Sequence, residues 1–253
     1  MASLAALGVA AMWLAALLAP RLGLAFSLRS QLALGELLLA LPVLVFLLAR
    51  PSDRRAAFGR GSIPVRTAGL SVVLGAALWV GSLGLMEMQS LAFPPSEETL
   101  ELFRRIHAAL APSGPLDVLV SLVIIAVLPA VCEELVLRGA LLPSLALRLG
   151  GLPAVVVTAV VFALIHGDLV RLLFTFALGL LLGLLRLGTR SLWPPVIVHV
   201  TLNSLTFAIA PLVDDPSRPY TPQPALGLAC LVAGAALSVP LLRALRREPA
   251  PPA

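Results

Sequence analysis

The sequence predicts an all-α, polytopic membrane protein. Two numbers lead to this fold class: 59% of the 253 residues are hydrophobic and only 12% are charged. A soluble domain of this length needs a more polar composition, because its surface faces water. The third observation is that apolar runs long enough to cross about 30 Å of hydrocarbon recur along the whole chain.

Eight segments have the length and apolarity of transmembrane helices. The fifth and sixth are short, and the sequence His-Gly-Asp at 166–168 separates them. A basic loop at 50–66 and a polar interval at 87–116 divide the earlier segments, and within the polar interval we expect a short amphipathic helix capped near Ser96. The predicted spans are 3–19, 31–49, 67–86, 117–137, 152–166, 169–186, 192–212 and 224–242.

The net charge of +5 comes from 18 basic residues, all of them arginine. The arginines gather in short loops between apolar runs, which is typical of the positive-inside rule and not of a nucleic-acid surface. If the amino terminus lies in the cytoplasm, twelve of the 18 arginines fall on the cytoplasmic side. Eight crossings also return the chain to the side on which it began. We therefore expect a multi-pass protein of the cell (inner) membrane with both termini cytoplasmic, the lipid bilayer as partner and no nucleic acid.

Polar and ionisable side chains that lie in or beside these apolar segments include Glu133, Glu134, His166, His199 and Asn203. Ionisable and polar groups at membrane depth are costly and usually face a protein interior or a water-filled cavity. They are therefore the candidate functional residues.

The spacing allows these side chains to meet. Glu133 lies 17 residues before Gly150, and His166 lies 15 residues after Gly151. An antiparallel hairpin turning at these two glycines would place both residues at nearly one height, about 25 Å from the turn. His199 lies about 10 Å into its own helix, and Asn203 follows it by four residues and so shares its face.

The charges also have expected local partners. Glu134 and Arg138 are four residues apart, in the order that supports a helical ion pair. Glu133 has no such partner and points about 100° away around the helix. It is the carboxylate left free to act as a general base.

The residues fall into three motifs that resemble the CPBP family, the intramembrane CAAX proteases and bacteriocin-processing enzymes that include abortive-infection-type proteins. The motifs are EExxxR, FxxxH and HxxxN, in this order. The resemblance covers roughly residues 117–207 and implies an endopeptidase whose site lies in a conical intramembrane cavity open to the cytoplasm. The residues that carry it are Glu133, Glu134, Arg138, Phe162, His166, His199 and Asn203.

The resemblance also implies roles. Glu133 and His166 would activate a water molecule, and His199 and Asn203 would stabilise the oxyanion. Glu134 and Arg138 would orient the helix or support the site, and Phe162 would pack against its wall.

Two mechanisms stay open for such a family member. One is a metalloprotease in which Glu133, His166 and His199 bind zinc. The other is metal-free hydrolysis by a glutamate-activated water. The helical HExxH pattern of many zinc proteases is absent.

We predict three parts: three helices and an extracytoplasmic amphipathic segment at 1–116, the catalytic core at 117–212, and the last helix with a disordered cytoplasmic tail at 213–253. The expected function is endopeptidase cleavage of a membrane-associated protein or peptide, prenylated CAAX tails included. Two alternatives are a transporter in which the same residues relay ions and a catalytically inert immunity or scaffold protein of the same fold.

Overall fold

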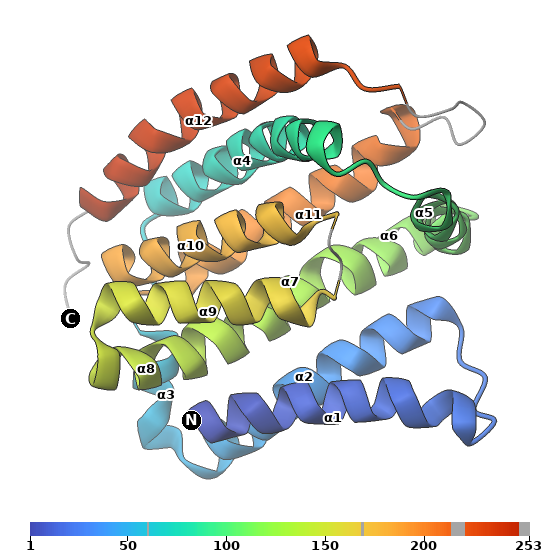
Figure 1. Ribbon diagram of the computed structural model, residues 1–253. Helices are drawn as coiled ribbons and strands as arrows, with labels where there is room; N and C mark the ends of the chain where they lie inside the picture. Colours follow the sequence, from blue (N-terminus) through green and yellow to red (C-terminus); the bar gives the residue numbers. More distant parts are fainter. Residues whose placement is uncertain (60, 168–169, 214–220, 248–253) are drawn as a thin grey trace.

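A computed structural model describes residues 1–59, 61–167, 170–213 and 221–247 (Figure 1). These ranges are almost entirely helical, and within them no strand forms beyond one isolated bridge between Gly59 and Ser191. The all-α, polytopic prediction is therefore confirmed. The tail expected to be disordered, at 248–253, lies outside the described residues.

The helices follow the predicted spans closely. Six helices of the described chain are long and apolar enough to cross a membrane, and two shorter apolar helices, Gly151–Ile165 and Trp193–Ile209, complete the expected eight. The bounds are α1 Ala2–Arg21, α2 Leu28–Ala49, η1 Pro51–Asp53, α3 Arg54–Phe58, α4 Val65–Ala92, α5 Glu97–Leu110, α6 Pro115–Leu122, η2 Val123–Val127, α7 Leu128–Glu134, η3 Leu135–Leu141, α8 Leu142–Leu149, α9 Gly151–Ile165, α10 Leu172–Thr189, α11 Trp193–Val213 and α12 Pro224–Arg247.

The elements α6 to α8 form one continuous helical path of 35 residues, Pro115–Leu149. Two π-helical turns, η2 and η3, interrupt it on either side of α7. Each lies one turn before a proline, Pro129 or Pro143. A proline lacks the N–H that would bond four residues back, and its ring collides with that carbonyl, so the preceding turn widens.

The hairpin expected at the glycine pair is present. Gly150 ends α8 with φ +83, and α9 begins at the next residue and returns beside α8. The predicted cap of α5 is also confirmed, because the Ser96 hydroxyl accepts a hydrogen bond from the Thr99 N–H at 3.2 Å.

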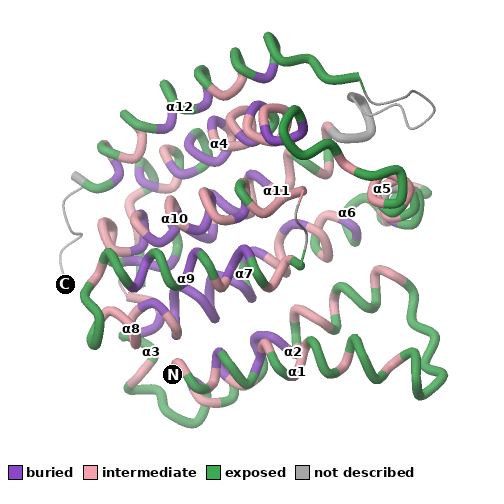
Figure 2. The backbone as a smooth tube through the Cα atoms, viewed as in Figure 1, coloured by how far each residue is buried: buried purple, intermediate pink, exposed green. Residues whose placement is uncertain are grey.

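The α1–α2 hairpin lies at one edge of the bundle and the α4–α12 pair at the other, with α7, α9, α10 and α11 between them (Figure 1). The start of α1 and the end of α12 lie at the same end of the bundle. Buried residues concentrate on α7, η3 and the helices that face them, whereas much of α1 and α12 is exposed (Figure 2). The exposed side chains include Leu14, Leu17 and Leu237, as expected for lipid-facing helices.

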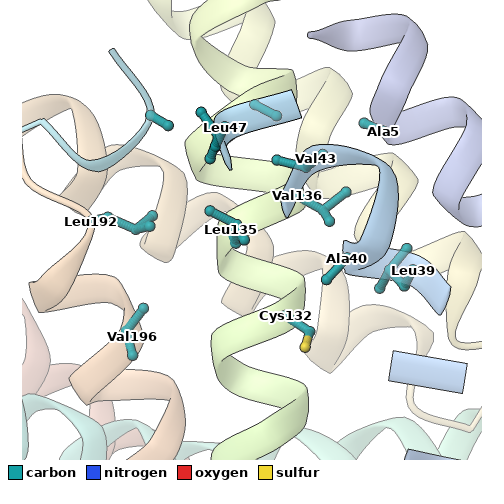
Figure 3. Packing of buried hydrophobic residues seen from close by; sticks show 12 residues of the cluster. Ala5, Leu39, Ala40, Val43, Leu47, Cys132, Leu135, Val136, Leu192 and Val196 are labelled. Atoms are coloured by element: carbon teal, nitrogen blue, oxygen red, sulfur yellow. The ribbon is translucent and has the colours of Figure 1, made fainter. Parts of the chain in front are cut away.

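The α1–α2 hairpin packs directly against the central helix. Figure 3 shows Leu39 and Ala40 of α2 beside Cys132, and Val43 of α2 near Val136. The members of this buried cluster are apolar, so burial of apolar area holds α2 to α7 and η3.

The short helix α3 covers the end of the bundle next to η3 and α11. The Leu192 N–H donates to the Phe58 carbonyl at 3.0 Å, and the buried Arg186 guanidinium donates to the carbonyls of Ala56 and Ala57. These bonds join the basic loop to the turn between α10 and α11.

Candidate active site

Arg138 organises a buried polar network on the central helix. Its Nη1 donates to Glu134 Oε1 at 2.8 Å, and its Nη2 donates to the Gly179 carbonyl of α10 at 3.0 Å. Arg138 and Glu134 are wholly buried. The predicted Glu134–Arg138 ion pair is confirmed, and it fixes α7 and η3 against α10.

His199 joins the same network from α11. Its Nδ1 lies 3.1 Å from Glu134 Oε1. A carboxylate that is paired with arginine only accepts hydrogen bonds, so Nδ1 of His199 is the donor. In its neutral form the ring presents the lone pair of Nε2 on its opposite side.

Glu133 faces that lone pair. Its Oε2 lies 3.6 Å from His199 Nε2, and its Oε1 lies 4.0 Å from His166 Nε2. His166 Nδ1 lies 2.8 Å from the Phe162 carbonyl, which only accepts, so Nδ1 is the donor. One imidazole from the end of α9 and one from α11 therefore face the same carboxylate.

Phe162 forms the wall between the two imidazoles. Its ring meets His166 edge to face at 4.7 Å between centroids, and meets His199 in the same manner at 5.8 Å. The Arg138 guanidinium carbon lies 4.9 Å from the centre of the Phe162 ring. Phe162 is wholly buried, and it restrains both rings in their orientation.

Asn203 lies one helical turn beyond His199 on α11 and is half-buried. Among the residues that the structure describes, its amide makes no hydrogen bond, so both its N–H₂ and its oxygen are free for a ligand. Within the described residues, no hydrogen bond or ion pair joins Asn203 to Glu133, His166 or His199.

Glu133 and His199 are buried, and His166 is half-buried. The side chains of Glu133 and His199 keep 8% and 4% of their surface, whereas that of His166 keeps 20%. Glu133 Oε2 is buried without a hydrogen-bond partner in the described part of the chain. The predicted conical cavity stays a prediction, and His166 marks the side on which the group reaches the surface.

The resemblance implies Glu133, His166 and His199 as the ligands of a zinc ion. Within the described ranges, no three His, Cys, Asp or Glu side chains are grouped as a metal-ion site. Metal dependence stays a prediction for experiment.

Two buried polar groups near the candidate site were not predicted from the sequence: a carbonyl and a carboxylate. Gly179 supplies a carbonyl to Arg138, which no side-chain pattern could indicate. Glu36 is a lone carboxylate in an otherwise apolar part of α2, and its half-buried side chain places one oxygen in the interior. The same rule that selected Glu133, a charge inside an apolar span, could have found it.

Residues 115–205 match the family described as type II CAAX prenyl endopeptidase Rce1-like. The CAAX-protease resemblance is confirmed. The CAAX-protease match contains all three motifs, from Glu133 to Asn203.

A curated relative points the same way. The Bacillus subtilis (strain 168) protein named "Putative membrane peptidase YdiL" is 27% identical over 139 residues, which are 55% of this chain and 52% of that protein. The chain thus spans about half the length of the curated relative it matches. No solved structure matches the chain.

Proposed function

We propose that this protein is an intramembrane endopeptidase. It hydrolyses a peptide bond of a membrane-associated protein or peptide, with prenylated CAAX-type tails as one candidate substrate class. The observation that carries the proposal is the placement of two imidazole Nε2 atoms, at 3.6 and 4.0 Å, around the unpaired Glu133 carboxylate. The match of residues 115–205 to CAAX endopeptidases supports it.

The distances suit a water molecule held by this group. Both exceed a direct hydrogen bond, which spans about 2.7–3.2 Å, so a water can bridge the carboxylate and an imidazole. Glu133 takes a proton from that water while the water oxygen attacks the carbonyl carbon of the substrate. The proton then passes from Glu133 to the leaving nitrogen as the C–N bond breaks, giving a carboxylic acid and an amine.

The oxyanion of the intermediate needs donors. His199 donates at Nε2 when its ring has taken a proton from solvent before the attack, and the Glu134 carboxylate at Nδ1 stabilises that imidazolium. The Asn203 amide on the same helix supplies a second N–H. Arg138, itself bound to Gly179, holds Glu134 in place for this role.

The test compares hydrolysis by the full-length chain and by Glu133→Gln, which preserves the size of the side chain. The probe is a fluorescence-quenched peptide that carries a farnesyl anchor and is presented in liposomes. The same peptide with an acyl anchor, and without any anchor, shows whether cleavage depends on the kind of anchor. We expect Glu133→Gln to lower kcat/KM about 100-fold or more, because it removes the general base. Mass spectrometry of the products locates the cleaved bond.

Glu98→Gln, an exposed carboxylate on α5, is the control and should match the wild type. Equal cleavage by Glu133→Gln and wild type would reject the mechanism. Proton-coupled ion flux without peptide cleavage would favour the transporter alternative instead.

A further inference from the structure

Glu36 lies on the face of α2 that contacts the central helix. It precedes Leu39 by three residues and Ala40 by four, so the three side chains share one face. Leu39 and Ala40 belong to the buried cluster that contains Cys132, the residue next to Glu133 (Figure 3). The face of α2 that carries Glu36 is therefore turned toward the part of the central helix that carries Glu133.

No partner within the described chain satisfies this carboxylate. Glu36 Oε2 is buried without a hydrogen bond there. The nearest cationic or imidazole groups of the site are engaged elsewhere: Arg138 donates to Glu134, and His199 is bound to Glu134 as well. A buried carboxylate is stabilised most by a positive charge.

The α1–α2 hairpin brings Glu36 to the exposed side of the site. A side chain built at Gly35 would lie 3.7 Å from Met12 of α1, and one at Gly167 would lie 3.3 Å from the Trp13 ring. Gly167 directly follows His166, the member of the group that reaches the surface. Trp13 and Glu36 are therefore on neighbouring turns of the hairpin, and Trp13 lies beside the half-buried end of the group at His166.

The height of Glu36 relates it to the substrate. It lies one helical turn from Ala40, which belongs to the same buried cluster as Cys132, and one turn rises about 5.4 Å. An extended peptide covers about 3.3 Å per residue. A substrate side chain bound at Glu36 would therefore belong to a residue within two positions of the bond that Glu133 cleaves.

We propose that Glu36 is a specificity-determining residue whose carboxylate binds a cationic side chain, lysine or arginine, within two residues of the scissile bond. The inference rests on the proposed peptidase function and names a feature of its substrate. It assigns α2, outside the matched segment 115–205, a part in substrate choice.

The experiment uses the full-length protein in liposomes and anchored peptides with lysine at one of the four positions flanking the mapped scissile bond. Each peptide is paired with one that carries norleucine, which is of similar length and uncharged. We expect the wild type to cleave the lysine peptide of at least one position about tenfold faster in kcat/KM than its norleucine pair, because a site built for a polar group rejects the analogue without it. Glu36→Gln should reduce that ratio to within about twofold.

The ratio is measured within one variant, so a partly folded preparation scales both rates alike. Glu36→Asp keeps the charge and should keep a lysine preference, and Glu98→Gln should leave the ratio at the wild-type value. Equal cleavage of lysine and norleucine peptides at all four positions, or an unchanged ratio in Glu36→Gln, would overturn the inference while leaving the peptidase intact. Absence of cleavage of every peptide by the wild type would instead reject the proposed function.

Discussion

At the scale of single residues, the most consequential side chain is Arg138. It is wholly buried, yet it bonds Glu134, the Gly179 carbonyl and the face of Phe162. A charge this deep is tolerated because each interaction replaces part of its lost hydration. The same burial makes the carboxylate of Glu134 dependent on it.

Breaking this pair should destabilise the fold. We expect Arg138→Leu to lower the free energy of unfolding by about 3–5 kcal/mol, because it leaves the Glu134 carboxylate buried without a counter-charge. The double variant with Glu134→Leu should lose less, since an apolar pair removes both buried charges. Denaturant unfolding in detergent micelles measures both. A single variant as stable as the wild type would contradict this account.

Metal dependence is a second prediction at this scale. The donors around Glu133 are not arranged as a metal-ion site. We therefore expect hydrolysis to persist after dialysis against a chelator, with less than one equivalent of zinc bound by elemental measurement of active protein. Loss of activity on chelation that zinc restores would show a metalloprotease with Glu133, His166 and His199 as the first ligands to examine.

At the scale of elements, the site depends on how closely α10 approaches α9. A Cβ at Gly179 would lie 2.9 Å from the Ala159 Cα, and one at Gly183 would lie 2.9 Å from Val155. Small residues four apart let two helices approach this closely within a membrane. That approach places the Gly179 carbonyl within reach of Arg138.

A methyl group should therefore disturb this contact. We expect Gly179→Ala to destabilise the protein by about 1–3 kcal/mol, because the added Cβ meets backbone of α9 that must shift. The matched control is Gly69→Ala on α4, where a Cβ meets nothing within 4 Å. It should be neutral or stabilising by up to about 1 kcal/mol, the gain in helix propensity. Thermal unfolding in micelles compares the two, and equal effects would reject the packing argument.

At the scale of the whole molecule, the bundle buries Glu133 within the 35-residue helical path Pro115–Leu149 and exposes apolar side chains on its outer helices. In a membrane, each loop then lies on the side of the bilayer at which its two helices end. The arginine distribution predicts the loop with α3 in the cytoplasm and α5 on the opposite side.

Single cysteines test this orientation in a background without Cys132 and Cys230. A membrane-impermeant thiol reagent should label Glu98→Cys in intact cells, because Glu98 is exposed on α5 and the predicted topology places α5 outside the cytoplasm. It should label Ser52→Cys, in the basic loop, only after the membrane is disrupted. The reverse pattern would overturn the predicted topology.

Much of the fold and of the site was determined by the sequence alone. The eight apolar segments, the Ser96 cap, the glycine hairpin and the Glu134–Arg138 pair follow from composition and short spacing, which act within one helix or one turn. Equal heights of Glu133 and His166 follow from counting residues to a turn. These features depend on local geometry that every sequence of this pattern shares.

The tertiary structure determines which groups from different helices meet, and spacing within one helix or turn does not predict this. Which imidazole nitrogen faces Glu133 depends on the partners of the other nitrogen, Glu134 Oε1 and the Phe162 carbonyl. The Gly179 carbonyl reaches Arg138, and the face of α2 that carries Glu36 lies against the central helix, because α10 and α2 pack there with particular faces. Contacts between helices far apart in sequence depend on the packing of the entire bundle, so only the assembled structure assigns them.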